Sequence, residues 1–368
     1  MMSRVPFSNL LAQYEQLKEQ LDLAISEAIK GSTFIGGKNV EDFEEGFKKL
    51  IGVNNCVSCA NGTDAIYIAV KGLGLKAGDE VITTAHSWIA TSEAVTQAGG
   101  KVIFCDTTRD TFCIDGDQIE DKITSRTVGI IPVHLYGHPA DMIQIMKIAA
   151  KHKLWVLEDC AQAHLSTLDG RNAGCFGDVA TYSFYPGKNL EAMGDAGAIV
   201  TDNNDLAEWC SLFARHGGKG RHVIEGVNSR MDSIQAAILN VKMPHLSRWT
   251  TERRKAAMYY SQRLQGLLDI KTPVEKEGAQ HVYHLYTVLC NRRDELRAHL
   301  KKHGVETNIN YPVSLPFLPA YSYMSKSPRD FPVAHESQSR ILSLPLFPEI
   351  SRDQQDYVCD LIYHFLEA

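Results

Sequence analysis

The first half of the chain alternates between two spacings of hydrophobic residues. Apolar residues recur every three or four positions in segments that are typical of helices, 40–52, 63–75, 88–100 and 140–153. Between these segments lie short apolar runs that are typical of buried strands, 54–60, 78–84, 101–106, 126–137 and 154–159. Alternating strands and helices predict a mainly parallel sheet that is covered by helices on both faces.

The pattern changes in the second half. Two strand-like runs, 177–184 and 197–201, are joined by a Gly-rich segment in place of a full helix, so one of them is expected to run antiparallel to its neighbour. Beyond about residue 231 long helical patterns dominate, with one more strand-like run; these segments are 232–249, 253–268, 281–290 (the strand), 294–304 and 351–367. We therefore predict a large α/β domain over residues 1–245, N-terminal helix included, and a small C-terminal α+β domain over residues 246–368.

The composition is that of a globular protein. Of 368 residues, 44% are hydrophobic and 22% are charged, which excludes a disordered, collagen-like or repeat-array chain. Acidic residues outnumber basic ones by 44 to 38, and no basic stripe offsets the net charge of −6. Nucleic acid and membranes are therefore not expected as partners. Because the sequence has no apolar signal-peptide core and no window of 18 uncharged apolar residues, we expect a cytoplasmic protein.

The cysteines do not indicate a disulfide framework or a metal site. The chain has 9, an odd number at irregular spacings, which favours free thiols. Only Cys56 and Cys59 form a C-x-x-C pair, and they lie in a predicted strand. Residues three apart in a strand point to opposite faces, so this pair cannot share a metal ion. We predict no metal site.

Polar residues with characteristic chemistry follow the predicted strands. In open α/β sheets, ligands bind at the carboxyl ends of the strands. Asp159 ends one strand, Lys188 follows another, and Gly62-Thr63 opens a helix directly after a third. Trp88 follows the strand 78–84. A carboxylate, a lysine, a Gly-Thr helix start and an aromatic residue at one sheet edge fit a site for pyridoxal phosphate (PLP).

Each of these groups has a physical reason to be there. A lysine amine can form a Schiff base with the PLP aldehyde, and a carboxylate beside the pyridine nitrogen keeps that nitrogen protonated; Lys188 and Asp159 would take these roles. The N–H groups at a helix N-terminus bind a phosphate, and the Ser183 hydroxyl is a further donor. Trp88 could lie over the ring, with a stacking energy of about 0.5–1.5 kcal/mol.

Each residue also has an ordinary structural interpretation. Lys188 could be a solvated loop lysine, Asp159 could cap the N-terminus of a helix, and Trp88 could belong to the hydrophobic core. The local sequence leaves these alternatives open.

An ordered string of motifs carries a resemblance to a known family. The segments EDCAQAH, GCFGDVATYSFYPGKNL and GDAGAIVT resemble the DegT/DnrJ/EryC1/StrS family of nucleotide-sugar aminotransferases, which are fold-type I PLP-dependent transferases. The resemblance extends through ANGTDAI, VITTAHSWIATSEAV, PVHLYG and GVNSRMDSIQAAILNVKM, and so from about Phe34 to Tyr311. It implies a seven-stranded large domain, a smaller C-terminal domain, and a homodimer with active sites at the subunit interface.

The resemblance assigns cofactor roles to particular residues. Lys188 corresponds to the Schiff-base lysine, Asp159 to the partner of the pyridine nitrogen, and Gln162 to the residue beside the cofactor's 3-hydroxyl. Trp88 corresponds to the aromatic residue that stacks on the ring. The phosphate cup corresponds to Gly62, Thr63 and Ser183, together with Asn228 from the second subunit.

Substrate residues follow less directly. Phe34 lies in a segment similar to one that lines the sugar pocket, and His216 and Lys219 lie in a loop similar to one near the nucleotide pyrophosphate; for these residues a solvated loop is the alternative. His164 is a further candidate, although a histidine after a strand end is more often structural. Where many relatives read His-Tyr-Pro, this chain has Asn310-Tyr311-Pro312, which weakens the prediction of the substrate.

The expected activity is transfer of an amino group from L-glutamate to a keto carbon of a nucleotide-linked deoxy-sugar, carbon 3 being favoured over carbon 4. The family also contains sugar dehydratases, in which histidine replaces the lysine, so Lys188 favours transamination. The alternatives are a same-fold enzyme that acts on a cyclitol ketone or as a sugar dehydratase, and a non-catalytic regulator that keeps the PLP fold.

Overall fold

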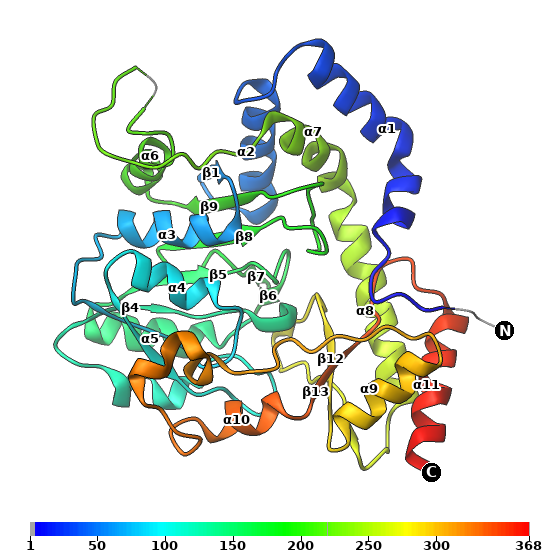
Figure 1. The fold of residues 1–368 in the computed structure, drawn as a ribbon. Coiled ribbons are helices and arrows are strands. Elements are labelled where there is room, and N and C mark those ends of the chain that lie inside the picture. Colours follow the sequence, from blue (N-terminus) through cyan, green and yellow to red (C-terminus); the bar gives the residue numbers. More distant parts are fainter. Residues whose placement is uncertain (1–3, 219, 368) are drawn as a thin grey trace.

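The computed structural model describes residues 4–218 and 220–367, and its largest element is a seven-stranded sheet (Figure 1). The strands stand in the order β1-β9-β8-β5-β4-β2-β3. Their bounds are Asn55–Cys59 (β1), Glu80–Thr84 (β2), Lys101–Cys105 (β3), Thr127–Ile131 (β4), Trp155–Asp159 (β5), Val179–Ser183 (β8) and Gly197–Thr201 (β9). β9 is antiparallel to both neighbours and the other pairs are parallel. The prediction of a mainly parallel sheet with one reversed strand is confirmed.

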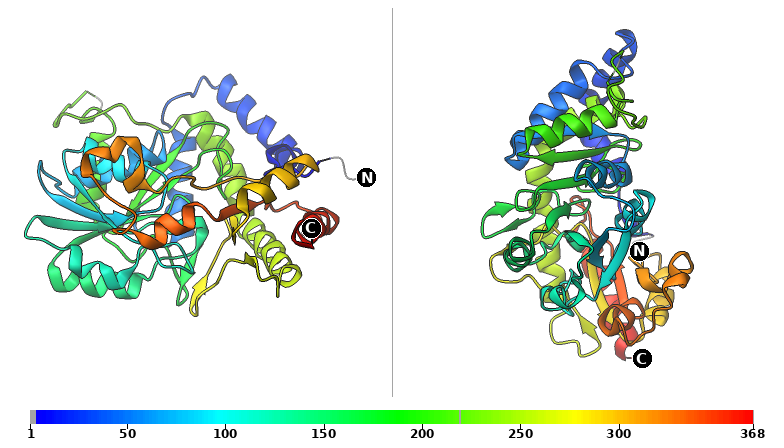
Figure 2. Two further views of the ribbon diagram at one scale, coloured as in Figure 1. Left: turned by 60° about the horizontal axis from the view of Figure 1, so that its bottom comes forward. Right: turned by 90° about the vertical axis from the view of Figure 1, so that its left-hand side faces the viewer.

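Helices cover both faces of this sheet, as the two views of Figure 2 show. One face packs against α3 (Gly62–Gly72), α4 (Ala90–Gln97) and α6 (Asn204–Phe213). The other face packs against α2 (Lys38–Ile51), α5 (Met142–His152) and α7 (Ser233–Lys242). Along β1, Cys56 lies in the core of one face and Cys59 in the core of the other, so the prediction that they face opposite sides is confirmed.

A second core lies in the C-terminal lobe. There α8 (Leu246–Arg263), α9 (Arg293–Lys302) and α11 (Arg352–Glu367) pack on an antiparallel sheet of β10 (Ile270–Lys271), β12 (Tyr286–Cys290) and β13 (Ile341–Leu344). A third small sheet contains β6 (Thr167–Leu168), β7 (Arg171–Asn172) and β11 (Ala279–Gln280).

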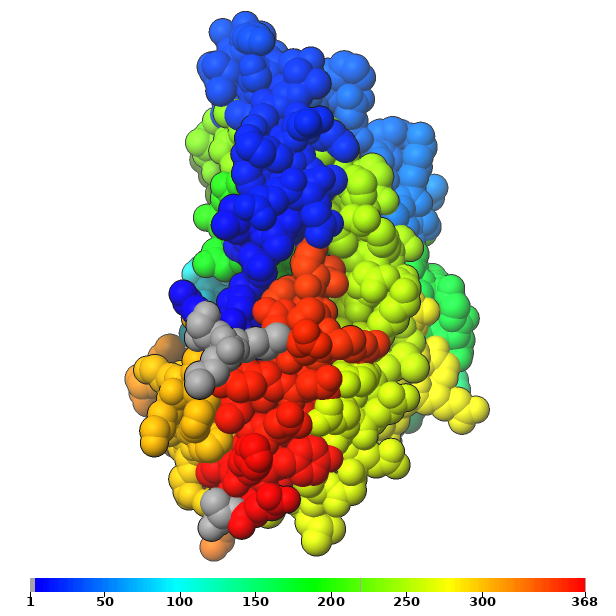
Figure 3. Space-filling view, turned by 90° about the vertical axis from the view of Figure 1, so that its right-hand side faces the viewer, coloured from blue at the N-terminus to red at the C-terminus, as the bar shows by residue number. Residues whose placement is uncertain are grey.

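The start of the chain reaches this lobe. Figure 3 shows α1 (Leu10–Lys30), α8 and α11 on one face of the molecule, and Val5 pairs with Val305. The predicted division after residue 245 stays a prediction. Among the helices that the structure describes, none has both the length and the hydropathy of a membrane span.

One segment of the C-terminal lobe completes the core of the large sheet. The 3-10 turns Leu315–Phe317 and Pro319–Met324 and the helix α10 (Pro332–Gln338) bring apolar side chains against α3, α4 and β3. Asp106, which follows β3 and is fully buried, accepts hydrogen bonds from the N–H groups of Val333 and Ala334, each at 2.9 Å. The first turn of α10 is thereby attached to the edge of the large sheet.

Three predicted elements differ from the structure. The strand predicted over 126–137 ends at Ile131, because Pro132 has no N–H to donate to a strand ladder. The helix predicted over 232–249 is interrupted at Met243–His245, where Pro244 breaks the α-helical hydrogen bonding, and α8 then runs from Leu246 through most of the next predicted helix. The strand predicted over 281–290 begins only at Tyr286.

Candidate active site

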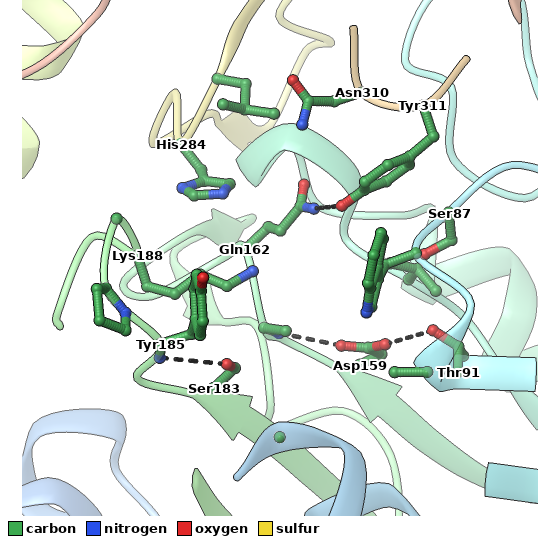
Figure 4. A pocket seen from close by; sticks show the side chains of 18 of the residues that line it. Ser87, Thr91, Asp159, Gln162, Ser183, Tyr185, Lys188, His284, Asn310 and Tyr311 are labelled. Atoms are coloured by element: carbon green, nitrogen blue, oxygen red, sulfur yellow. Dashed lines mark hydrogen bonds between the residues drawn. The ribbon is translucent and has the colours of Figure 1, made fainter. Parts of the chain in front are cut away.

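A cavity of about 520 Å³ opens at the carboxyl edge of the large sheet (Figure 4). Residues that follow β1, β2, β5 and β8 line one side of it. The C-terminal lobe supplies the other side, with Arg253, His284, Leu285, Asn308, Asn310, Tyr311 and Leu346. The cavity is therefore at the place where open α/β sheets bind ligands, and it is covered by a second lobe.

The start of α3 lies at this cavity. Asn61 caps the helix, because its Oδ1 accepts the N–H of Asp64 at 2.8 Å. Gly62 and Thr63 line the cavity together with Ser183 from the end of β8. A Cβ atom at position 62 would lie only 2.7 Å from the Cβ of Ser183, so only glycine allows this approach. The residues predicted for the phosphate cup of this chain are brought together.

Asp159 ends β5 and is buried at the edge of the cavity. Its Oδ2 accepts a hydrogen bond from the Thr91 hydroxyl at 2.7 Å, and its Oδ1 accepts the N–H of Ala161 at 3.1 Å. No helix begins after Asp159 in the described residues up to β6, so the interpretation of Asp159 as a helix cap is wrong. These two donors hold the carboxylate in a fixed orientation toward the cavity.

Lys188 lies in the loop between β8 and β9 and lines the same cavity. Figure 4 shows the side chains of Lys188 and Asp159 directed into the cavity from two sides. Burial lowers the pKa of Lys188 to about 8, while the charge of Asp159 opposes this shift. A solvated loop lysine would keep an ordinary pKa, so that alternative does not fit the structure.

The loop that carries Lys188 is held by buried polar groups. The N–H of Gly187 donates to Glu191 at 2.6 Å, and the other carboxylate oxygen of Glu191 lies 3.3 Å from the ammonium nitrogen of Lys242. Glu191 and Lys242 are both almost fully buried. Further along the loop, the N–H of Met193 donates to the side chain of Gln235 at 2.8 Å. Because Gln235 and Lys242 both belong to α7, one helix holds two points of the lysine loop.

Gln162 and Trp88 also line the cavity. The side-chain oxygen of Gln162 accepts the N–H of Tyr136 at 2.6 Å, and its nitrogen donates to the hydroxyl of Tyr311 at 2.9 Å. Trp88 is 58% exposed, with its ring 5.4 Å from that of Tyr311. The interpretation of Trp88 as a core residue is therefore wrong for this chain by itself.

Other predicted substrate residues lie elsewhere. Phe34, His216 and Asn228 are exposed and do not line the cavity of their own chain. His216 and Asn228 belong to the segment after α6 that extends away from the sheet in Figure 1. Lys219, in the same segment, lies outside the described residues. Roles for these residues at an active site require a second subunit.

His164 is not brought to the cavity. It is fully buried among the rings of Phe47, Tyr182 and Phe184. Neither ring nitrogen has a hydrogen-bond partner among the described residues. Burial, and then the positive charge of Lys188, lower the pKa of His164 to about 3, so the imidazole is neutral.

One buried group of possible metal ligands occurs in the described residues, at His134, Glu158 and Cys160. Its members are already engaged by the protein. Glu158 accepts a hydrogen bond from His134 at 3.0 Å and three more from backbone N–H groups at residues 174, 176 and 177. The other ring nitrogen of His134 accepts the N–H of Ala140 at 2.9 Å. This arrangement is that of a satisfied buried pair.

Several cavity residues were not among the predicted site residues. His284 lies in the part of 281–290 that was predicted as a strand, and Arg253 lies inside a helical pattern. Thr91, the donor to Asp159, belongs to α4. The local sequence around Arg253 and His284 carries no signal, because their position depends on how the C-terminal lobe docks.

The cavity residues fit PLP. A helix N-terminus with a glycine packed against Ser183 leaves room and N–H donors for a phosphate. Asp159 keeps acceptor capacity for a pyridinium N–H. Lys188 supplies an amine of lowered pKa in the same cavity. These three observations come from different parts of the chain.

Comparisons with known proteins agree with this geometry. The model of the DegT/DnrJ/EryC1/StrS aminotransferase family matches residues 15–363. A protein of Geobacillus stearothermophilus named pleiotropic regulatory protein is 43% identical, covering 98% of this chain and 98% of its own. A dTDP-3-amino-3,4,6-trideoxy-alpha-D-glucose transaminase of Streptomyces venezuelae is 38% identical, covering 99% of this chain and 97% of its own.

Solved structures have the same fold. The crystal structure of S. venezuelae DesV in complex with a ketimine intermediate superposes with a TM-score of 0.97, at 39% identity and with both chains fully covered. NtdA from Bacillus subtilis with bound cofactor PMP superposes with a TM-score of 0.92, at 34% identity, covering 100% of this chain and 86% of that one. The chain therefore belongs to the DegT/DnrJ/EryC1/StrS aminotransferase family, and it is a PLP-dependent transaminase.

Proposed function

We propose that this enzyme transfers an amino group from L-glutamate to a keto carbon, carbon 3 in preference to carbon 4, of a nucleotide-linked deoxy-sugar. The observation that carries the proposal is the meeting of Lys188, Asp159 and the start of α3 in one cavity. Relatives named as acting on 3-amino sugars support the choice of carbon, among them the S. venezuelae transaminase and a UDP-N-acetyl-3-dehydro-alpha-D-glucosamine 3-aminotransferase of Acidithiobacillus ferrooxidans.

Residues of this chain would hold the cofactor as follows. The N–H groups at Gly62 and Thr63 and the hydroxyl of Ser183 bind the phosphate. Asp159, oriented by Thr91, keeps the ring nitrogen protonated. Gln162, fixed by its hydrogen bond to Tyr311, faces the ring's 3-hydroxyl, and Trp88 covers a ring face.

When bound, PLP supplies an electron-withdrawing ring that stabilises negative charge at the donor's α-carbon. Lys188 moves the proton from that carbon to the methine carbon of the cofactor, and its lowered pKa provides neutral amine for this task near neutral pH. The C-terminal lobe, with His284, Asn310 and Leu346 at the cavity wall, excludes water. Because donor and acceptor use the same cavity in turn, we expect ping-pong kinetics.

We propose a homodimer with shared sites. Asn228 is exposed in its own chain and away from the cavity, which is the placement expected of a residue that reaches a second subunit's phosphate cup. Phe34 and His216 share this placement, and we propose that they approach the substrate in the dimer.

The visible absorption spectrum of the purified protein, with and without L-glutamate, tests the proposal. We expect the visible band of bound PLP to fall on addition of glutamate and the absorption of pyridoxamine phosphate to rise. Lys188→Ala should abolish this conversion, and Lys76→Ala, a substitution of an exposed lysine, should leave it unchanged. Response to another amino acid only would overturn the donor.

A panel of acceptors tests the substrate class. We expect amination of nucleotide-linked 3-keto sugars, with the carbon identified by NMR of the product. Amination of a free cyclitol ketone would favour the cyclitol alternative, and loss of water from the sugar would favour the dehydratase. Absence of a visible band after incubation with PLP would favour the non-catalytic regulator.

A further inference from the structure

The cavity contains a positive charge that the proposed function leaves unused. Among the described residues that line the cavity, the only Lys and Arg side chains are Lys188 and Arg253. Arg253 comes from α8 in the C-terminal lobe and is 7% exposed. Burial lowers its pKa to about 10, so the guanidinium stays charged at neutral pH.

Only part of this guanidinium is engaged by the protein. Its Nη1 donates to the backbone carbonyls of Leu346 at 3.0 Å, and of Tyr283 and His284 at 3.4 Å each. Its Nε is buried and has no acceptor among the described residues. The hydrogen bonds that the group makes to described residues all leave from Nη1. A guanidinium has five N–H donors, so Nε and Nη2 remain available to a ligand.

Arg253 lies on the Lys188 side of the cavity. His284 separates the two, because the pKa of His284 is lowered by burial and by the positive charges of both Lys188 and Arg253. Figure 4 shows His284 next to Lys188. An anionic group bound at Arg253 would therefore lie near the amine that receives the donor's proton.

The partial engagement suits a cavity that binds two substrates in turn. An amino-acid donor brings a carboxylate next to its amino group, whereas a neutral deoxy-sugar brings none at the reacting carbon. A buried cation with no partners would be left unpaired in the sugar complex, at a large cost. The three carbonyls keep Arg253 hydrogen-bonded in both states, while its spare donors can still bind a carboxylate.

We infer that Arg253 binds the α-carboxylate of the amino donor, through Nε and Nη2. This inference rests on the proposed function, in which an amino acid reacts at Lys188, but it does not depend on which amino acid is the donor. A carboxylate and an arginine pair through two parallel hydrogen bonds, which would orient the donor's α-carbon as well as bind it.

Two variants of Arg253 test the inference, with glutarate as an unreactive probe of the holoenzyme. Arg253→Lys keeps the charge but loses the paired donors, and Arg253→Gln loses the charge. We expect the Kd for glutarate, measured by calorimetry, to rise roughly 10-fold in the first and roughly 100-fold in the second. The KM for glutamate in the donor half-reaction should rise in parallel.

Two controls separate this role from a structural one. Arg254→Gln alters the next residue of α8, which pairs with Glu275 and does not line the cavity, and should leave the Kd for glutarate unchanged. The second half-reaction, in which the pyridoxamine phosphate form converts the keto-sugar, should keep its rate within about threefold in Arg253→Lys, because that substrate makes no ion pair there.

The outcomes are distinguishable. Wild-type Kd and KM values in both Arg253 variants would overturn the inference and leave the proposed function intact. If no amino acid converts the wild-type cofactor, the proposed function fails, and the glutarate measurement still decides on Arg253. If both variants fail to fold, a crystal structure of the wild-type holoenzyme with glutarate decides: we expect a carboxylate oxygen within hydrogen-bond distance of Nε or Nη2, and a carboxylate bound elsewhere overturns the inference.

Discussion

At the scale of single residues, the phosphate end of the site depends on one close approach. Gly62 lies against Ser183, and any larger residue at position 62 would meet the Ser183 Cβ at 2.7 Å. The same contact places the first N–H groups of α3 beside the serine hydroxyl. Space for a phosphate and donors to bind it thus come from a single missing side chain.

We predict that Gly62→Ala weakens PLP binding by about 10-fold or more, because overpacking costs about 1–3 kcal/mol and displaces Ser183 from the cup. The Kd for PLP, from fluorescence titration of the apoenzyme, measures this effect. Ser183→Gly alone should also weaken binding by losing the hydroxyl. The double variant should bind PLP no more weakly than Ser183→Gly, since the clash is gone; additive losses would contradict the steric explanation.

The Lys188 amine predicts a pH dependence. Burial lowers its pKa from 10.5 to about 8 in the folded chain, so the folded apoenzyme holds fewer protons than the unfolded chain between pH 8 and 10.5. The free energy of unfolding should therefore rise with pH across this window through Lys188, a contribution that is absent below pH 8. Lys188→Met should remove this contribution in urea unfolding of the apoenzyme, and identical pH profiles for the two proteins would contradict it.

At the scale of elements, α7 supports the lysine loop from outside the cavity. Glu191 accepts the N–H of Gly187, next to Lys188, and is itself paired with Lys242 of α7. Replacing a buried ion pair by apolar residues is often neutral for stability. The loop's hydrogen bond can therefore be removed without leaving a buried charge.

We predict that the double variant Glu191→Leu with Lys242→Leu folds with near wild-type stability but transfers the donor's proton about 10-fold more slowly, since the peptide beside Lys188 loses its acceptor. The matched control is Glu191→Gln with Lys242→Leu, in which the glutamine oxygen can still accept the N–H of Gly187, and its rate should recover. Stopped-flow spectroscopy of the donor half-reaction measures both. Equal rates in the two double variants would show that the hydrogen bond has no positioning role.

What could be predicted from the sequence follows the same scale. Asp159, Ser183 and Lys188 could be placed at one edge because each follows a strand whose pattern is local. His284 and Arg253 could not, because they reach the cavity only through the docking of the C-terminal lobe. The long strand predicted up to residue 137 failed at Pro132, since hydrophobic pattern alone does not register a missing N–H donor.

At the scale of the whole molecule, the proposed dimer makes a prediction that one chain cannot fulfil. Asn228 and Lys188 of one chain would belong to different active sites. Mixing Lys188→Ala with Asn228→Ala subunits, after reversible dissociation, should restore about a quarter of wild-type activity, because half of the random dimers then contain one intact site. Each parent alone should be inactive or weakly active. A mixture no more active than its parents would place both residues in the same site.

The attachment of α10 to Asp106 has a consequence for the order in which the protein is made. Strand β3 and helices α3 and α4 leave the ribosome early, yet their shared core also needs Leu315, Tyr321, Phe331 and Ala334. Folding of this part cannot be completed during the synthesis of the first two thirds of the chain. A nascent chain therefore exposes an apolar surface beside β3 until translation is almost finished, and premature termination would release a protein that chaperones and proteases recognise as incomplete.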